Sequence, residues 1–288
     1  MLTIGRYEIR SVVTGTFRLD GGAMYGVVPR TLWSKGAEPD DQNRIPLATR
    51  TLLAVDRKAG RIILTDTGCG TKWTPDDAER FAIRHDGEAV TRALHAIGAT
   101  ENDVTDVFVT HLHFDHNGGL TDWTDQPGGA TTPRYPKARH WLHRKQWDHA
   151  HNPTPRDRAS YLQEDFEAIA EAGLFHFVDG DAPPSPLEGV EWFLSHGHTP
   201  YQLLPVFVGD GVRLVFTGDV VPTVGHLRPP WVMAYDLYPL TTIAEKQWLY
   251  ERAIRDGWLL AFPHDPKLAG VALDGVIDRP VVARTLDL

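Results

Sequence analysis

Cysteine and long apolar runs are scarce in this chain of 288 residues. The single Cys69 excludes an internal disulfide and fits a reducing compartment. No apolar run approaches the roughly 18 residues that a membrane-spanning helix needs. Residues 1–6 also lack the basic region and apolar region of a signal peptide. We therefore expect a cytoplasmic protein that makes no contact with a membrane.

Positive charge is in deficit as well. The chain has 29 Lys and Arg against 38 Asp and Glu, a net charge of −9, and no run of basic residues. A surface of that sign repels phosphate backbones, so the composition argues against a nucleic-acid partner. Hydrophobic residues at 42% and charged residues at 23% are typical of a globular protein. No low-complexity segment divides the chain, and we predict one domain over residues 1–288.

Histidine is abundant, with 14 residues, and three of them stand in one short segment. The apolar run 106–109 leads directly into Thr110-His111-Leu112-His113-Phe114-Asp115-His116-Asn117-Gly118-Gly119. Imidazole is a common ligand of transition metals, and a carboxylate beside it is typical of Zn²⁺, Fe²⁺ or Mn²⁺ sites. In an extended segment His111 and His113 point the same way, whereas Asp115 and His116 follow a turn and can face a second ion. The segment therefore predicts a metal site at a strand end.

Strand and helix patterns alternate around this segment. Apolar periodicity predicts two short strands within 3–19 and further strands over 46–56, 61–65, 106–109, 138–142, 190–194, 203–208, 212–216 and 258–262. Helical spacing predicts helices over 75–84, 87–97, 144–149, 156–172 and 241–255. We expect residues 121–134 to be irregular, and His140, His143, His149 and His151 to lie mostly on the surface. This α/β order places ligands at the carboxyl ends of strands.

His-x-His-x-Asp-His after a strand resembles the signature of the metallo-β-lactamase superfamily. The resemblance implies an α/β fold, a four-layer αβ/βα sandwich of two mixed β-sheets flanked by helices. Its later metal motifs match Gly197-His198-Thr199-Pro200, Asp219 after the strand 212–216, and His264 after the strand 258–262. His196 stands where relatives commonly have proline and competes with His198, which the flanking Gly and Thr-Pro favour. Tyr201 replaces a frequent glycine.

The same resemblance implies two divalent metal ions, Zn²⁺ in the first place with Fe²⁺, Co²⁺ and Mn²⁺ as alternatives. His111, His113 and His198 would hold one ion, Asp115, His116 and His264 the other, and Asp219 would bridge them. A hydroxide between the ions would attack the substrate, with Asp115 or Asp219 shuttling a proton. Asp66 resembles the family's aspartate that orients a ligand histidine; alternatively, it caps backbone N–H groups in a turn.

A closer resemblance covers most of the chain. Residues 20–29, Leu32-Trp33-Ser34-Lys35 and Trp231–Asp236 resemble a bacterial subgroup of quorum-quenching lactonases that act on N-acyl-homoserine lactones. It implies a substrate-covering loop over 20–35 and a lining for an acyl chain, unless the aromatics simply pack in the core. Pro222 stands where some lactonases have a substrate-orienting tyrosine, which Tyr25 or Tyr235 could replace. The expected substrate-binding residues are Met24, Tyr25, Trp33, His226, Trp231, Met233 and Tyr235.

Three functions remain open on the sequence alone. The first is a lactonase for a small substrate with an apolar portion. The second is an arylesterase or a phosphotriesterase resembling methyl parathion hydrolase, and the third is a non-catalytic metal-binding protein of the same fold. A bridging aspartate is not typical of true β-lactamases, and nuclease relatives usually carry an extra domain and a basic surface. The aromatic content and the habit of the family also suggest a homodimer.

Overall fold

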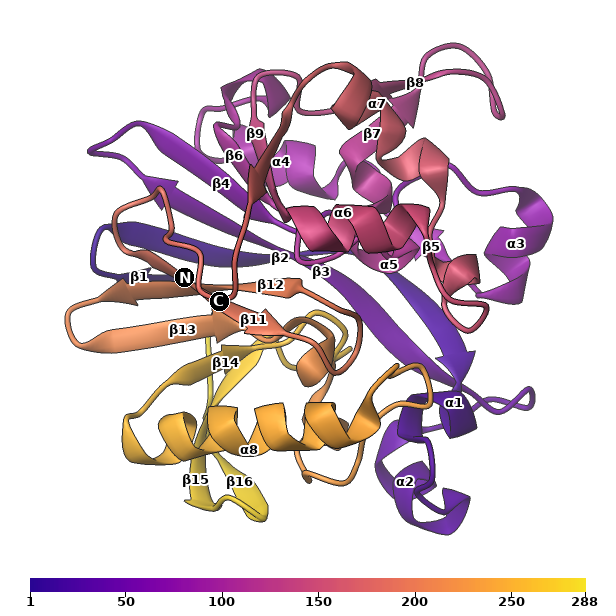
Figure 1. Cartoon of the computed structure of the whole chain (residues 1–288), viewed down its shortest axis with the longest axis vertical. Helices are drawn as coiled ribbons and strands as arrows, with labels where there is room; N and C mark the ends of the chain where they lie inside the picture. The colour runs from indigo at the N-terminus through magenta and orange to yellow at the C-terminus, as the bar shows by residue number, and fades with distance from the viewer.

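Two β-sheets packed face to face form the centre of the computed structural model, which describes all residues from 1 to 288 (Figure 1). The first sheet has the order β1-β2-β3-β4-β6-β9-β10, with β5 paired to β2. Its strands are β1 (Leu2–Ile4), β2 (Tyr7–Asp20), β3 (Arg44–Asp56), β4 (Arg61–Thr65), β5 (Arg84–His85), β6 (Asp106–Phe108), β9 (Arg139–His143) and β10 (Phe175–Val178).

The second sheet has the order β11-β12-β13-β14-β15-β16. Its strands are β11 (Val190–Ser195), β12 (Gln202–Gly209), β13 (Val212–Phe216), β14 (Leu259–Ala261), β15 (Gly270–Val276) and β16 (Arg279–Thr285). A separate pair, β7 (Thr121–Trp123) and β8 (Thr131–Pro133), lies in the segment that the sequence predicts to be irregular.

Each sheet is mixed, and its parallel pairs bring strand ends together. In the first sheet β4 is parallel to β6 and β6 to β9. In the second sheet β13 is parallel to β14. Because parallel neighbours finish at the same edge of a sheet, the loops after β4 and β6 emerge side by side, as do those after β13 and β14.

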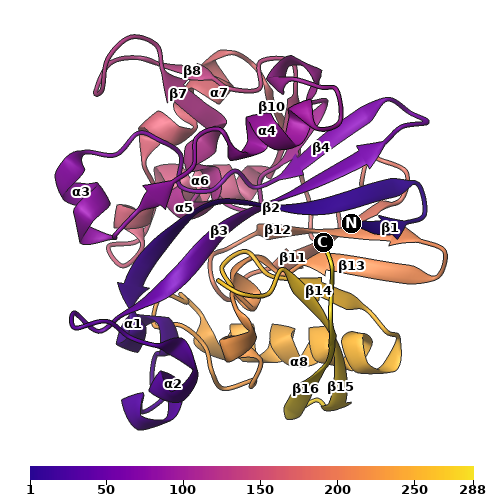
Figure 2. The ribbon, with the colours of Figure 1, turned by 180° about the vertical axis from the view of Figure 1, so that it is seen from behind.

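Helices cover the outer faces of both sheets (Figures 1 and 2). Over the first sheet lie α4 (Ala89–His95), α6 (Arg144–His151) and α7 (Glu167–Glu171), and α8 (Pro239–Arg255) lies over the second. The remaining helices are short: α1 (Gly21–Tyr25), α2 (Arg30–Ala37), α3 (Pro75–Arg80) and α5 (Phe114–Asn117). None of the helices combines the length and the apolar character needed to cross a membrane.

Three apolar cores separate four layers and confirm the predicted αβ/βα sandwich. The middle core joins the sheets through side chains such as Leu52 and Phe108 on one and Phe207 and Phe216 on the other. A second core packs α4, α6 and α7 on the first sheet, and a third packs α8 on the second. Strand β3 is buried almost throughout, including its polar residues Thr49, Arg50 and Thr51.

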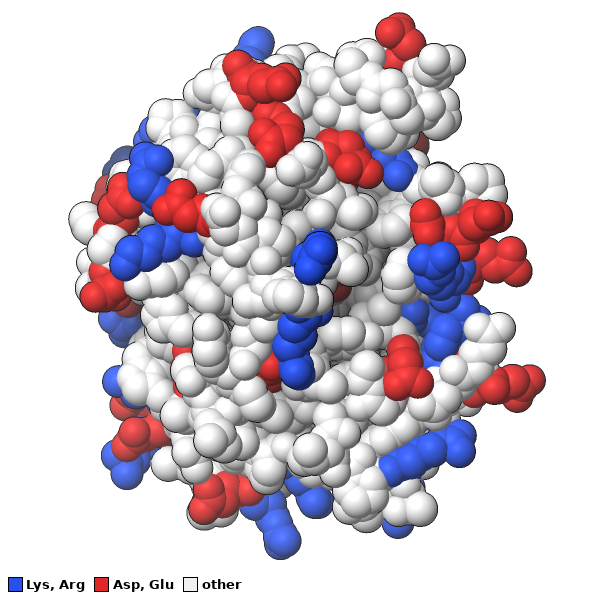
Figure 3. All heavy atoms as spheres, turned by 45° about the vertical axis from the view of Figure 1, so that its right-hand side comes forward, with Lys and Arg blue, Asp and Glu red and all other residues white.

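Local signals set the ends of the predicted helices that do form. Thr74 caps α3 by accepting a hydrogen bond from the Asp77 N–H, and Pro75 occupies the first helical position. Pro239 lies in the first turn of α8, and Gly257, with φ of 69°, follows its end. On the face drawn in Figure 3, acidic and basic side chains are interspersed without a continuous patch of one sign.

The predicted helix over 156–172 is wrong. Only Glu167–Glu171 forms an α-helix there, preceded by 3₁₀ turns at Arg158–Ser160 and Gln163–Asp165. Tyr161 has extended backbone angles, and its hydroxyl lies 2.9 Å from Oγ1 of Thr199, a contact between distant segments. Such a tertiary contact overrides helical spacing.

The expectation for the second group of histidines also fails in part. His140 and His143 are fully buried rather than on the surface, because β9 is an inner strand of the first sheet. In the segment 20–35, where the sequence predicts a substrate-covering loop, α1 forms and α2 begins. Met24 and Trp33 are in the core, 1% and 2% exposed, whereas Leu32 is 48% exposed. The covering role of this segment stays a prediction.

Candidate metal centre

Seven side chains at the ends of the strands converge in two groups of candidate metal ligands. The first group is His111, His113 and His198; the second is Asp115, His116, Asp219 and His264. Within each group the donor atoms lie within 4.8 Å of one another. The structure thus brings together all seven ligands expected from the sequence.

The loop after β6 owes its shape to close backbone packing. A Cβ on Gly118 would lie 2.2 Å from the carbonyl oxygen of Cys69, and a Cβ on Gly70 would lie 2.1 Å from that of Gly118. Only glycine fits at these two positions. The loop that carries the first four ligands is therefore pressed against the loop after β4. Phe114 then begins α5, the short helix that carries Asp115 and His116.

The turn that carries His198 is held by α8. The Glu245 carboxylate accepts hydrogen bonds from the His196 N–H at 2.6 Å and from the Ser195 hydroxyl at 2.7 Å. A Cβ on Gly197 would lie 2.3 Å from Oγ1 of Thr242, so α8 approaches too closely for another residue. Tyr201 has φ of 60°, the left-handed conformation that glycine favours. The turn is thus retained although the glycine is replaced.

Asp219 faces both groups at once. Its Oδ2 lies 3.2 Å from Nε2 of His198, whereas its Oδ1 lies 3.3 Å from Nε2 of His116 and 3.2 Å from Nε2 of His264. Within the first group, Nδ1 of His113 is 3.0 Å from Nε2 of His198, and within the second the Nε2 atoms of His116 and His264 are also 3.0 Å apart. The donor atoms therefore point at two common centres.

These residues fit metal ions by an independent criterion. Nε2 of His111 and Oδ1 of Asp219 are buried without a hydrogen-bond partner. Unpaired buried polar atoms are costly, and a cation in the first group would satisfy His111, whereas a cation in the second would satisfy Oδ1 of Asp219. Imidazole and carboxylate donors suit Zn²⁺, Fe²⁺, Co²⁺ and Mn²⁺.

Asp66 lies where the sequence placed it, beside a ligand histidine. Its Oδ2 is 2.8 Å from Nδ1 of His116, and its Oδ1 accepts the Thr110 N–H at 2.8 Å. The residue has φ of 53°, a strained conformation for a side chain other than glycine. A partner on the far nitrogen fixes the orientation and tautomer of a ligand imidazole.

Asp236 has the same relationship to His198, and the sequence interpretation did not identify it. Its Oδ1 lies 3.0 Å from Nδ1 of His198, and the side chain is 1% exposed. The two residues are 38 positions apart, and no motif spacing connects them. The only signal in the sequence was that Asp236 ends the segment Trp231–Asp236, and we assigned that segment to substrate binding instead.

Burial and charge set the protonation of the ligands. Burial lowers the pKa of His111 and His113 well below the usual range and keeps these imidazoles neutral, as metal binding requires. Burial would also lower the pKa of His198, but the Asp219 carboxylate raises it overall. For Asp219 burial acts to raise the pKa, yet His116 and His198 lower it well below its usual value. The carboxylate is thus ionised.

A cavity of about 220 Å³ opens onto both groups of ligands. Five of the seven ligands line it: His113, Asp115, His198, Asp219 and His264. The apolar part of its lining consists of Phe17, Leu19, Met24, Leu47, Phe81, Phe114 and Met233. The other polar side chains are Arg156, Asp157, Ser160 and Tyr235. Residues 156–160 were missed by the sequence analysis because we assigned them to a helix.

The expected substrate-binding residues fall into separate places. Met24, Met233 and Tyr235 line the metal cavity. Tyr25, Trp33 and Trp231 instead line a second cavity of about 430 Å³, and Leu47 lies between the two. His226 reaches neither cavity: it is fully buried, its Nε2 lies 2.8 Å from the Met24 carbonyl oxygen, and its ring stacks on Tyr25.

Comparisons with known proteins agree with this geometry. A curated N-acyl homoserine lactonase, AttM of Azorhizobium caulinodans, is 23% identical over 65% of this chain and 67% of its own length. A probable metal-dependent hydrolase from Staphylococcus aureus superposes with a TM-score of 0.86 at 28% identity, covering 99% of this chain and all of that one.

The dizinc quorum-quenching lactonase AidC has the same fold, with a TM-score of 0.78 at 16% identity, over 99% of this chain and 97% of its own. The family model described as the metallo-beta-lactamase superfamily matches residues 51–264. This range contains all seven candidate ligands and ends at the last of them, His264. The chain therefore belongs to the metallo-β-lactamase superfamily and is a metal-dependent hydrolase.

Proposed function

We propose that this hydrolase is a binuclear lactonase that opens N-acyl-homoserine lactones. The observation that carries the proposal is the position of Asp219, which faces both ligand groups and lines a largely apolar cavity. The similarity to AttM and the fold shared with AidC, whose structure contains an acyl-homoserine product, support the same substrate class.

Two divalent ions would occupy the two groups. His111, His113 and His198 would hold one ion, Asp115, His116 and His264 the other, and Asp219 would contact both. The fold shared with a dizinc lactonase favours zinc. Paired divalent ions lower the pKa of water and polarise a carbonyl oxygen.

Tyr235 is the residue that we assign to orienting the lactone. It lines the metal cavity, whereas Tyr25 lines the second cavity. Burial raises the pKa of Tyr235 to about 12, so the phenol keeps its proton and can donate a hydrogen bond to the lactone carbonyl oxygen. Tyr235 would thus take the role of the substrate-orienting tyrosine that some lactonases have at the position of Pro222.

The remaining cavity residues divide between proton transfer and binding. Asp115 lines the cavity, and its carboxylate would carry a proton to the oxygen that leaves when the ring opens. Phe17, Met24 and Met233 would hold the acyl chain and exclude water, because they offer apolar surface to the cavity.

A lactone panel on protein of measured metal content tests the proposal. We expect two equivalents of metal per chain. We also expect ring opening of N-hexanoyl-homoserine lactone, which is measured through the acid that it releases. Paraoxon and an aryl acetate serve as parallel substrates for the alternative esterase and phosphotriesterase functions. Fully loaded protein that hydrolyses paraoxon but no lactone would replace the proposal with the phosphotriesterase function. Loaded protein inactive on all of them would favour a non-catalytic metal-binding protein.

A further inference from the structure

A third carboxylate lines the metal cavity outside both ligand groups. Among the acidic residues of the cavity wall, Asp115 and Asp219 belong to the candidate metal ligands, and Asp157 does not. Asp157 is 5% exposed and lies in the segment between α6 and α7.

Two neighbouring side chains fix the orientation of this carboxylate. Nε2 of His149, on α6, lies 2.6 Å from its Oδ2, and the Thr154 hydroxyl donates a hydrogen bond to its Oδ1 at 2.6 Å. No backbone N–H donates to either oxygen. An aspartate that stabilises a turn usually accepts hydrogen bonds from backbone N–H groups. Asp157 accepts none, so stabilising the local turn does not explain why an aspartate stands at this position.

The carboxylate has room for further hydrogen bonds. An ionised carboxylate offers about four lone-pair sites, and His149 and Thr154 use one on each oxygen. A carboxylate that faces a cavity and retains free acceptor sites is suited to a ligand that brings a hydrogen-bond donor.

The segment around Asp157 is hydrogen-bonded to the segment that carries Tyr235. Arg156 donates a hydrogen bond to the carbonyl oxygen of Ala234, the residue before Tyr235. Asp157 is therefore held at a fixed place relative to the tyrosine that we assign to the lactone carbonyl.

We infer that Asp157 accepts a hydrogen bond from the amide N–H of an N-acylated lactone and selects for substrates that carry this group. The inference rests on the proposed lactonase function. A lactone with a plain alkyl chain has no such donor, and the enzyme would still open it without help from Asp157. Asp157 is thereby a specificity residue, distinct from the seven metal ligands.

The test compares Asp157→Asn with the unchanged protein on two substrates, N-hexanoyl-homoserine lactone and an alkyl γ-lactone of similar length. A hydrogen bond to a charged acceptor corresponds to about ten- to hundredfold in kcat/KM. We expect a loss of that size on the N-acyl lactone, mainly through KM, and a change of less than about twofold on the alkyl lactone. N-Cyclopentyl hexanamide should also inhibit the variant less strongly than the unchanged protein.

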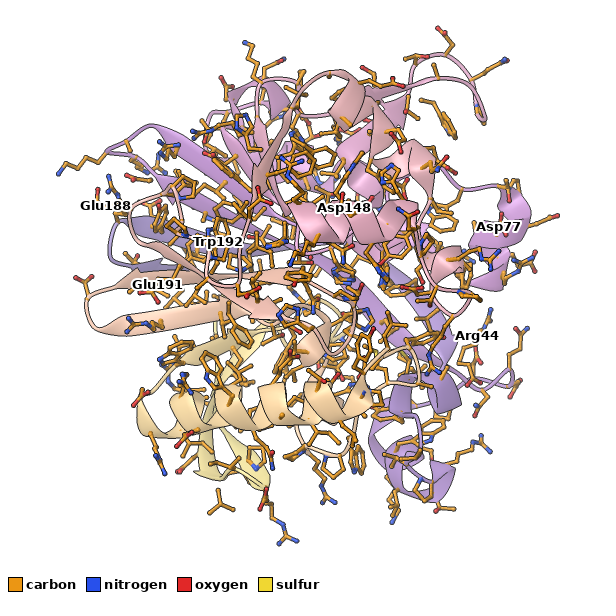
Figure 4. All side chains as sticks on the ribbon, viewed as in Figure 1. Arg44, Asp77, Asp148, Glu188, Glu191 and Trp192 are labelled. Carbon is orange, nitrogen blue, oxygen red and sulfur yellow. The ribbon has the colours of Figure 1, made fainter.

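Asp148→Asn is the matched control, because Asp148 is exposed on α6 outside the cavity (Figure 4). Metal content and melting temperature of each variant show whether it folds. Equal losses on both lactones, or no loss on the N-acyl lactone, would overturn the inference while leaving the lactonase proposal intact. If the unchanged protein opens the alkyl lactone only, the proposed substrate and the inference fail together; if it opens neither, the lactonase function fails and the inference with it.

Discussion

Nδ1 of His113 and Nε2 of His198 lie 3.0 Å apart, although 85 residues separate them in the chain. The first histidine follows β6 of one sheet, and the second follows β11 of the other. The packing of the two sheets thus brings two imidazole nitrogens, one from each sheet, to face a common centre. A divalent cation at that centre would tie the edges of the two sheets together.

His198→Ala should remove metal, and His196→Ala should not. His198 belongs to the first ligand group, whereas Nδ1 of His196 accepts the Tyr201 N–H at 3.2 Å and lies in neither group. Changing a residue beside a ligand already costs about 10–100-fold in metal affinity, so losing a ligand should cost more. Metal analysis after dialysis measures the effect. Loss of metal in the His196 variant alone would exchange the roles of the two histidines.

Met24→Ala should change the preference among acyl lengths, and Trp231→Ala should leave it unaltered. Met24 lines the metal cavity, whereas Trp231 lines the second cavity. Removing the Met24 side chain enlarges the space beside the ligands, which favours longer or bulkier chains. Values of kcat/KM for butanoyl to dodecanoyl homoserine lactones measure this preference. A shift in the Trp231 variant would mean that the acyl chain passes Leu47 into the second cavity.

Lys72→Met should destabilise the fold by about 3–5 kcal/mol, the usual cost of breaking a buried ion pair. Its Nζ lies 3.0 Å from Oδ1 of Asp165, and neither side chain is more than 3% exposed. It also donates hydrogen bonds to the carbonyl oxygens of Gly118 and Thr121, behind the metal loop. Burial raises the pKa of Asp165 to about 6 even beside this lysine.

Urea unfolding of Lys72→Met, Asp165→Asn and the double variant measures this pair. The double variant should lose less free energy than the two single variants added together, because it leaves no unpaired buried charge. Strictly additive losses would show that the two side chains do not interact.

Lys246 should make stability depend on pH. The side chain is fully buried in α8, and Nζ donates to the carbonyl oxygens of Arg228 at 2.9 Å and Trp231 at 2.8 Å. Burial lowers its pKa from 10.5 to about 7, against the charge of Asp236. Between pH 7 and 10.5 the unfolded chain binds more protons at this lysine than the folded one. The free energy of unfolding should therefore rise with pH across that window.

The measurement is the slope of unfolding free energy against pH from 7 to 10. Lys246 should contribute up to about 1.4 kcal/mol per pH unit to this slope, and Lys246→Met should remove that contribution. Identical slopes in the two proteins would show that the lysine titrates normally in the folded state.

The ligand motifs could be predicted because they are local. His111 to His116 follow a strand within six residues, and Asp219 and His264 each stand just past the end of a strand. Strand periodicity and the family resemblance together indicate these positions before any tertiary contact is known. The confirmed fold class has the same origin, since alternating strands and helices leave few ways to bury their apolar faces.

The cavity could not be predicted in the same way. Met24 and Tyr25 are neighbours in the sequence, yet α1 directs one to the metal cavity and the other to the second cavity. Helical spacing over 156–172 gave no sign that Tyr161 would pack near His113, with ring centroids 4.8 Å apart. Nor did it show that Asp157 would face the cavity.

The sequence by itself determined which residues can bind metal and which strands carry them, because ligand chemistry and strand alternation are properties of short segments. The tertiary structure decided which side chains line the cavity and that Asp236 orients His198. Those outcomes depend on contacts between segments far apart in the chain, and the packing of the two sheets and their helices fixes them only when the whole core is formed.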